Sequence, residues 1–146
     1  RFESRGLGDV YKRQDITSNT STDFVFNIQE FDNSSSYDTS NGRFTAPVAG
    51  KYYFGVQIYA GFNGAGVRVM HAHFRVNGTS VAQTDMFGGA SNHGGTLYHP
   101  TAVGHMIRNL NANDYVTFNL GGFSHTGGQA ILYASTGNRF FGYLIG

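Results

Sequence analysis

Residues 50–59 constrain the fold of this chain more than any other segment, because their apolar residues alternate with a period of two. One set would face one side of a strand and the second set the other: Tyr52, Phe54, Val56 and Ile58 against Tyr53, Gln57 and Tyr59. Period-two alternation is the signature of a β-strand with one buried face. We therefore predict a strand here with Phe54 in the core.

A second pair of alternating runs, residues 67–76 and 79–84, flanks the dipeptide Asn77-Gly78. Asn-Gly favours a two-residue hairpin turn, so these runs are predicted to pair as a β-hairpin. Further runs rich in aromatic and β-branched residues predict strands at residues 23–28, 43–46, 101–107, 115–120, 131–134 and 139–145.

Turn-forming residues separate these runs and predict loops at residues 31–42, 61–66, 88–95 and 121–128. No segment has the 3.6-residue period of a helix, and 21 Gly punctuate a chain of 146 residues. The sequence therefore predicts an all-β domain of about eight to ten strands.

The first 14 residues differ from the rest in being rich in charge and lacking strand periodicity. Their end, GDVYKRQ, resembles a translated sequencing-adapter scar, and an ordinary flexible arm is the alternative. We therefore expect residues 1–14 to be a non-native or disordered leader that contributes nothing to the fold. Residues 15–22 are expected to be a linker, and residues 23–146 the globular domain.

Overall charge and composition make several classes of function improbable. The chain has only 13% charged residues and a formal net charge of +1, which does not favour nucleic-acid binding. It has no Cys, so disulfides, thiol catalysis and thiolate metal sites are excluded. No apolar run reaches the roughly 20 residues that cross a bilayer, so membrane insertion is not expected.

The aromatic residues outnumber the places that a single core would offer. Phe118, like Phe54, is predicted to be buried, whereas Tyr53, Tyr59 and Tyr115 fall on the opposite faces of their strands. Near the C-terminus Phe141 and Tyr143 alternate with Phe140 and Leu144, so one of these two sets must also face away from the core. Large exposed apolar surfaces are uncommon in monomers, and the pattern predicts an obligate homotrimer.

A set of aromatic, acidic and glycine residues has a spacing that resembles the complement C1q globular-head family: Phe26, Asp32, Tyr37, Phe44, Gly50, Tyr52 and Phe54. Val56 departs from the pattern, which usually has an aromatic residue there. Residues 110–116 resemble the family's leucine, turn and Asp-x-Val segment, and residues 140–145 its closing Phe-x-Gly-aromatic-Leu strand. The resemblance runs from about Asp23 to the C-terminus.

This resemblance implies a ten-stranded jelly-roll β-sandwich of the tumour-necrosis-factor-like superfamily that assembles as a trimer and binds ligands through its loops. Gly50 and Gly142 would have scaffold roles, where a side chain would hinder close packing. No binding motif of the family transfers to particular residues here. The metal site is therefore unknown, and no catalytic or cofactor-binding residue is assigned.

The candidate metal ligands of this sequence are His and Asp residues. His71 and His73 lie two residues apart on one predicted strand and could hold a transition metal, but no carboxylate near them in the sequence completes a ligand set, so a polar outer face or a trimer contact is the favoured explanation. The remaining histidines show no ligand spacing: His93, His99, His105 and His125. Four aspartates are candidate calcium ligands, without an EF-hand series: Asp32, Asp38, Asp85 and Asp114.

The glycine-rich segments lack the Lys and Ser/Thr of a phosphate-binding loop, and nothing fixes a catalytic triad, so the chain is not expected to be an enzyme. We expect a trimeric recognition module on a cell surface, on a virion surface or outside the cell, with an unidentified protein or carbohydrate ligand. A structural trimerisation tip or decoration domain of a fibre is the alternative. A soluble cytokine-like ligand is a third possibility.

Overall fold

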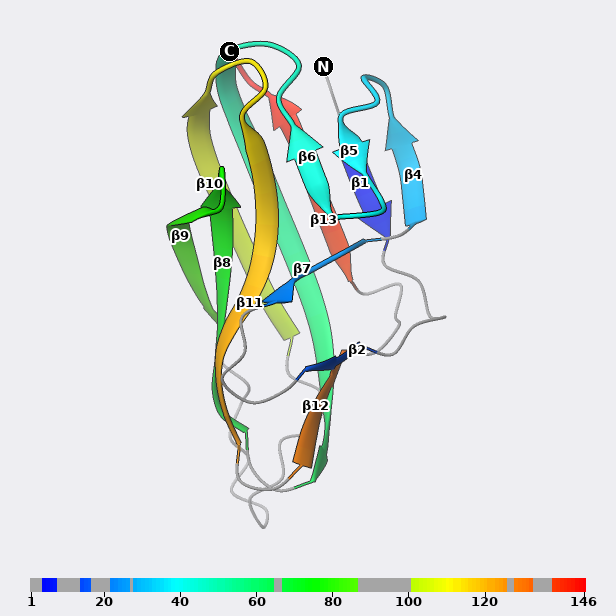
Figure 1. Ribbon diagram of the computed structural model, residues 1–146, viewed down its shortest axis with the longest axis vertical. Coiled ribbons are helices and arrows are strands. Elements are labelled where there is room, and N and C mark those ends of the chain that lie inside the picture. The colour runs from blue at the N-terminus through cyan, green and yellow to red at the C-terminus, as the bar shows by residue number, and fades with distance from the viewer. Residues whose placement is uncertain are drawn as a thin grey trace.

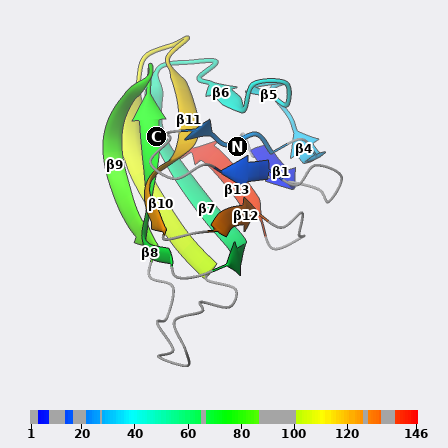
Figure 2. The ribbon, with the colours of Figure 1, turned by 60° about the horizontal axis from the view of Figure 1, so that its bottom comes forward.

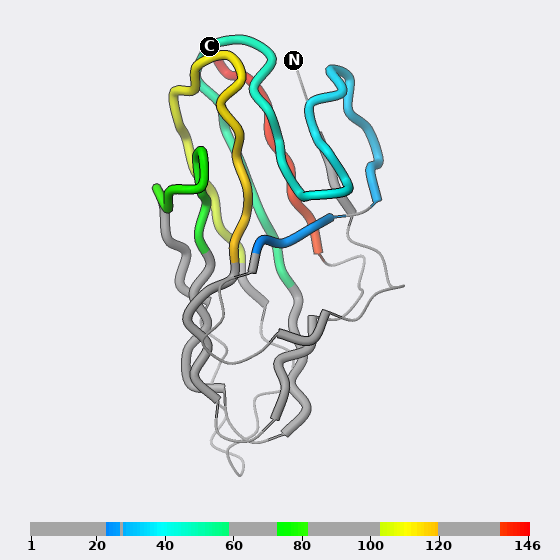
Figure 3. Tube along the Cα trace, in the orientation of Figure 1, coloured from blue at the N-terminus to red at the C-terminus, as the bar shows by residue number. Residues whose placement is uncertain are grey.

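The computed structural model describes residues 4–7, 14–16, 22–26, 28–64, 67–86, 101–125, 128–132 and 138–146 (Figures 1 and 3). All regular structure in these residues is β-strand, arranged as two sheets that pack face to face. The described strands number thirteen rather than the expected ten, because several short segments pair with the edges of the longer strands. The all-β jelly-roll prediction is confirmed.

The first sheet is built around the longest strand, β7 (Gly50–Gly64). Across the first part of β7 the strands follow the order β10 (Thr101–Leu110), β7, β13 (Arg139–Leu144), β1 (Ser4–Leu7) and β4 (Ile28–Asp32). The far part of β7 pairs with β12 (Gly128–Leu132), which in turn pairs with β2 (Gln14–Ile16). All of these pairings are antiparallel.

The second sheet has the order β5 (Tyr37–Asp38), β6 (Arg43–Thr45), β11 (Tyr115–His125), β8 (Val67–Val76) and β9 (Thr79–Met86). A two-residue strand, β3 (Thr22–Asp23), adds to the β6 side of β11. The edge strands β9 and β10 contact each other and close one side of the sandwich (Figure 2). As a result β10 is the outermost strand of the first sheet on that side.

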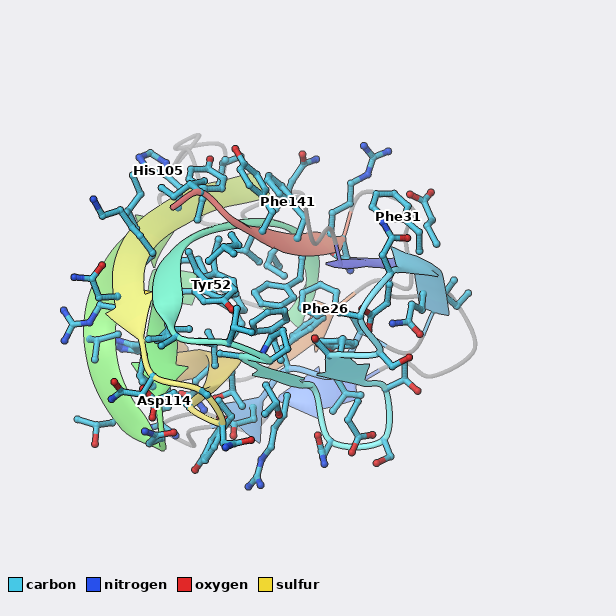
Figure 4. The ribbon with its side chains drawn as sticks, turned by 90° about the horizontal axis from the view of Figure 1, so that it is seen from above. Phe26, Phe31, Tyr52, His105, Asp114 and Phe141 are labelled. Atoms are coloured by element: carbon cyan, nitrogen blue, oxygen red, sulfur yellow. The ribbon has the colours of Figure 1, made fainter. Side chains whose placement is uncertain are left out.

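The core lies between the sheets and is mostly aromatic. Figure 4 shows Tyr52 and Phe26 pointing into this space. Phe54 is 0% exposed and packs edge-on against Phe44 of the second sheet, with ring centroids 5.2 Å apart. Phe118 is 2% exposed and meets Phe74 at 5.4 Å. The predicted burial of Phe54 and Phe118, and with it the register of their strands, is confirmed.

Two backbone features fix this arrangement. Asn77 and Gly78 both have positive φ, 51° and 80°, as a two-residue hairpin turn requires, so the predicted β8–β9 hairpin is confirmed. Gly142 faces Phe54 across the ladder, where a Cβ atom would come within 2.5 Å of the Phe54 ring. A glycine there lets the aromatic core pack against the backbone of β13.

Two of the predicted loops are largely strand instead. The segment 61–66 was expected to be a loop, but β7 continues to Gly64 and pairs with β12. Similarly β11 extends through the predicted loop 121–128 to His125, still paired with β8. Cross-strand hydrogen bonds favour the extended conformation at these glycines, which local turn propensity does not take into account. The segment 88–95 lies outside the described residues.

The N-terminal half of the chain also differs from its prediction. The first predicted strand, residues 23–28, gives way to β3 at Thr22–Asp23, an irregular stretch at residues 24–26, and β4 at Ile28–Asp32. Phe24 and Phe26 are still buried, at 5% and 1% exposure. Aromatic residues at these positions therefore indicate burial in the core and not a β-strand. A short β5 also lies within the predicted loop 31–42.

The structure differs most from the expectation for residues 1–14. Ser4–Leu7 forms β1, which lies between β13 and β4 and pairs with both. Local periodicity does not indicate this strand, and the expectation that residues 1–14 contribute nothing to the fold stays a prediction. Pairing requires only main-chain donors and acceptors, which any sequence supplies, and a period-two side-chain pattern is not needed. The adapter-scar origin of residues 1–14 stays a hypothesis, because strand pairing does not depend on where the segment comes from.

Candidate functional site

The outward surface of the first sheet carries apolar and aromatic side chains from three neighbouring strands. We call this surface the aromatic face, and it consists of Tyr53 on β7, Val103, His105 and Ile107 on β10, and Phe141 and Tyr143 on β13. Figure 4 shows His105 and Phe141 on the outer side of the sheet, away from Tyr52 and Phe26. Of the two alternating C-terminal sets, Phe140 and Leu144 therefore pack inward, and Phe141 and Tyr143 face out.

Tyr53 lies at the centre of the aromatic face. Its ring is 5.3 Å from that of Tyr143, 6.0 Å from that of Phe141 and 6.4 Å from the His105 imidazole. The Tyr53 and His105 rings are nearly parallel, with an interplanar angle of 12°. The rings of Tyr53, Tyr143, Phe141 and His105, from three strands, thus form one cluster. Ring contacts of this kind fix the orientation of the side chains.

A glycine in β7 leaves space for this ring cluster. Gly55 lies in register with Phe141 on one side and with His105 on the other. A Cβ atom on Gly55 would overlap the Phe141 ring, which therefore lies directly over the backbone of β7. The absence of a side chain at residue 55 therefore leaves room for the Phe141 ring.

The aromatic face is more exposed at its β10 side. Val103 is 67% exposed and Ile107 is 59% exposed, the two highest values among the large apolar side chains described. They lie on either side of His105 on the same face of β10. Exposed apolar groups at adjoining positions are typical of surfaces that a partner covers.

The outward surface of the second sheet has a different character. Asp23 accepts a 2.6 Å hydrogen bond from the Asn119 side chain and lies 3.5 Å from the Arg75 guanidinium. The sequence grouped Tyr115 with Tyr53 among the aromatic residues that face away from the core, but Tyr115 lies on the second sheet. The Arg43 guanidinium lies over its ring, 4.4 Å from the ring centroid. Among the described residues, the large exposed apolar side chains that belong to strands all lie on the first sheet.

The candidate metal-binding histidines of the described chain belong to three different strands. His71 and His73 both belong to β8, in register with Asp85 and Gln83 of β9. His125 ends β11, and His105 belongs to the aromatic face. No group of three His, Asp, Glu or Cys residues able to hold a metal occurs among the side chains described. His93 and His99 lie outside the described residues.

Three of the candidate calcium ligands instead organise turns. Asp32 accepts hydrogen bonds from the backbone N–H groups of Ser34 (3.2 Å) and Tyr37 (2.8 Å). Partial burial raises the pKa of Asp32, but hydrogen bonds from Tyr37, Ser36 and Ser34 outweigh it and leave the pKa below its usual value. Hydrogen bonds from the Ser40 side chain and backbone likewise lower the pKa of Asp38.

Asp114 links three turns at one end of the sandwich. Its carboxylate accepts 2.8 Å hydrogen bonds from the Asn77 side chain and the Asn111 backbone, which lower its pKa. The Asp114 carbonyl accepts a hydrogen bond from the Ala46 N–H, and the Asn77 side chain accepts one from the Tyr115 N–H. Sequence reasoning missed this link, although the hairpin Asn and the turn Asp are both visible in the sequence.

The described surface also has a shallow depression, which is a weaker candidate for a site. An open depression near the end of β10 is lined by Lys51, Ile107, Arg108 and Asn109, and its open shape does not enclose a ligand. Within the described ranges, no helix is present that could cross a bilayer. The role of His105 was also missed, because its neighbours on β7 and β13 are known only once the strands are paired.

Comparisons with known proteins agree with this architecture. The family model described as the C1q domain matches residues 10–145. The globular domain of zebrafish complement 1qA protein is similar in structure, with a TM-score of 0.62, 16% identity, and 99% and 96% of this and that chain covered. No curated protein matches the sequence.

Two structures of the TNF type show the same fold. Eiger TNF from S. frugiperda gives a TM-score of 0.67 at 9% identity, covering 99% of this chain and 93% of its own. Murine APRIL gives 0.64 at 8% identity, covering 97% and 95%. At these identities the likeness shows the fold alone. Since the family model spans almost the whole sequence, the chain belongs to the C1q domain family.

Proposed function

We propose that this chain is a non-enzymatic recognition module that assembles as a homotrimer through its aromatic face. Domains of the C1q and TNF type are binding modules that form trimers. The observation that carries the proposal is the exposure of Val103 and Ile107 beside the Tyr53 ring cluster. A closed ring of three copies buries such a face without leaving an open end for further growth.

Two properties of the face support a second copy as its occupant. Its aromatic residues are of the kind enriched at protein interfaces. It also adjoins the outermost strand β10, so a neighbouring copy can reach it from the side of the sandwich without disturbing the core. The polar outward surface of the second sheet remains outside the contact.

Sedimentation equilibrium of the whole chain tests the assembly, using Val103→Lys and the control Val48→Lys. Val48 is 43% exposed and lies in the turn before β7, away from the aromatic face. We expect a species of three times the monomer mass for the wild type and Val48→Lys. Val103→Lys places a charge in the contact, and we expect it to sediment as a folded monomer. A wild-type monomer at micromolar concentration would contradict the assembly.

Recognition would gain from three copies, because weak sites reinforce one another when several bind the same surface. We propose a protein or carbohydrate ligand outside the cell or on a cell or virion surface. The test compares binding of the wild type and of monomeric Val103→Lys to immobilised glycans and surface proteins. Ligands held at least about tenfold more tightly by the wild type support multivalent recognition. A trimer that retains nothing on such arrays would instead favour the structural tip of a fibre.

A further inference from the structure

His105 occupies a position where any partner that covers the apolar residues of β10 must cover it as well. Val103, His105 and Ile107 lie at alternate positions on one face of the strand. The imidazole is itself exposed in the single chain and stacks on Tyr53 at 6.4 Å. Burying Val103 and Ile107 in a contact between copies therefore removes His105 from water.

The charges around His105 do not favour a protonated imidazole. On the same face of the neighbouring strands, β7 contributes Lys51 and β13 contributes Arg139, and both are cationic. The described side chains of β9, residues 79–81, carry no charge, and its single acidic residue, Asp85, lies in register with His71 of the second sheet.

The nearest carboxylates within the first sheet are too distant to compensate. Glu30 and Asp32 belong to β4, which is four strands from β10 and hence about 19 Å away. Asp15 belongs to β2, which is joined through β12 to the far part of β7, six residues along that strand from the Gly55 that pairs with His105. Among the described side chains of the aromatic face, none is a carboxylate. A proton on His105 would thus place a charge on a surface that loses its water and that offers no described carboxylate to pair with the charge.

We infer that the trimer is acid-labile, and that protonation of His105 in each copy is the event that separates the copies. This inference rests on the proposed assembly through the aromatic face. Imidazoles exposed to water take up a proton near pH 6.5, whereas the buried, assembled form resists it. Protons therefore bind preferentially to separated chains, and assembly weakens as the pH falls below about 6.5.

The expected size of the effect follows from three identical sites. At pH 5.5 an exposed imidazole is protonated about ten times out of eleven. If the assembled form excludes the proton, the trimerisation constant falls by about 11-fold per site and about 1,300-fold for three sites. Because three chains associate, the concentration for half-assembly scales as the inverse square root of that constant and rises by roughly 36-fold.

Sedimentation equilibrium of the whole chain at pH 8.0 and pH 5.5 tests the inference, with His105→Gln and the control His73→Gln. Glutamine keeps a polar side chain of similar reach but does not titrate. His73 lies on β8 of the other sheet, so its removal leaves the aromatic face unchanged. We expect the wild type and His73→Gln to lose trimer at pH 5.5, and His105→Gln to retain it.

Each remaining outcome has a distinct meaning. A wild-type trimer that persists at pH 5.5 overturns the acid-labile contact alone and leaves the proposed assembly intact. Equal acid dissociation of His105→Gln and the wild type also overturns it, because another group must then take up the protons. A wild type that is monomeric at pH 8.0 overturns the proposed assembly, and the inference with it.

Discussion

At the scale of single residues, a buried tyrosine shows how side chains complete the main-chain hydrogen bonding of an irregular segment. Residues 24–26 are not part of a β-strand. The buried N–H group of Phe26 instead donates a hydrogen bond to the Tyr37 hydroxyl, at 3.0 Å. Burial, together with the nearby Asp38 charge, raises the pKa of the Tyr37 phenol well above its usual range, and the hydrogen bond from Phe26 offsets only part of this. Tyr37 is thus a neutral acceptor at every ordinary pH.

Replacing Tyr37 with Phe should destabilise the fold by about 1–3 kcal/mol, because a buried N–H group is left without an acceptor. Tyr52→Phe is the matched control, since the Tyr52 hydroxyl donates to the Val48 carbonyl in an exposed turn that water can reach. Its cost should be about 0.5–1 kcal/mol. Urea unfolding of both variants measures the difference, and equal costs would show that the Phe26 N–H finds another acceptor.

At the scale of elements, the sequence predicted long, regular strands well and short or irregular ones poorly. The alternation in residues 50–59 and the Asn77-Gly78 turn are local signals, and both were confirmed by the structure. By contrast, β1 and the glycine-rich extensions of β7 and β11 depend on partners far along the chain. Such strands are held by cross-strand hydrogen bonds, which leave no periodic pattern in the sequence.

For the aromatic face, the sequence predicted which residues point away from the core but not which strands lie next to one another. Alternation alone placed Tyr53 away from the core and showed that either Phe141 and Tyr143 or their neighbours must follow it. It could not show that Tyr115 belongs to the other sheet, because strand order is not encoded in any single strand. The position of His105 beside Tyr53 likewise depends on the pairing of β10 with β7.

The pairing of β1 can be tested by Arg5→Pro, with Arg5→Ala as its control. Arg5 lies in register with Phe141 of β13 on one side and Phe31 of β4 on the other, so proline removes a main-chain donor from the interior of the sheet. We expect a loss of at least about 1 kcal/mol, which lowers the thermal midpoint by about 3–6 °C. Alanine keeps the N–H group and should cost little. Equal midpoints for the two variants would support the expectation that residues 1–14 contribute nothing to the fold.

At the scale of the whole molecule, folding and assembly should respond to acid in different pH ranges. Asp32, Asp38 and Asp114 have pKa values lowered by hydrogen bonds that exist only in the folded chain. Their stabilisation is therefore fully present above the unfolded pKa of about 3.9 and is lost as the pH falls through the lower folded values. Assembly through the aromatic face is expected to weaken at a higher pH, below about pH 6.5, where exposed imidazoles take up a proton.

The monomeric Val103→Lys variant separates the two effects, because it has no contact between copies to lose. Its thermal midpoint, followed by far-UV circular dichroism, should be nearly constant from pH 7.5 to 5.5 and should fall steeply below about pH 4. Asp32→Asn should lower the midpoint at pH 7.5 and reduce the further drop at low pH, because the neutral side chain has no charge to lose. A midpoint of Val103→Lys that already falls by several degrees at pH 5.5 would mean that the monomer itself is acid-sensitive. Acid dissociation of the wild type would then reflect partial unfolding rather than a charge on the aromatic face.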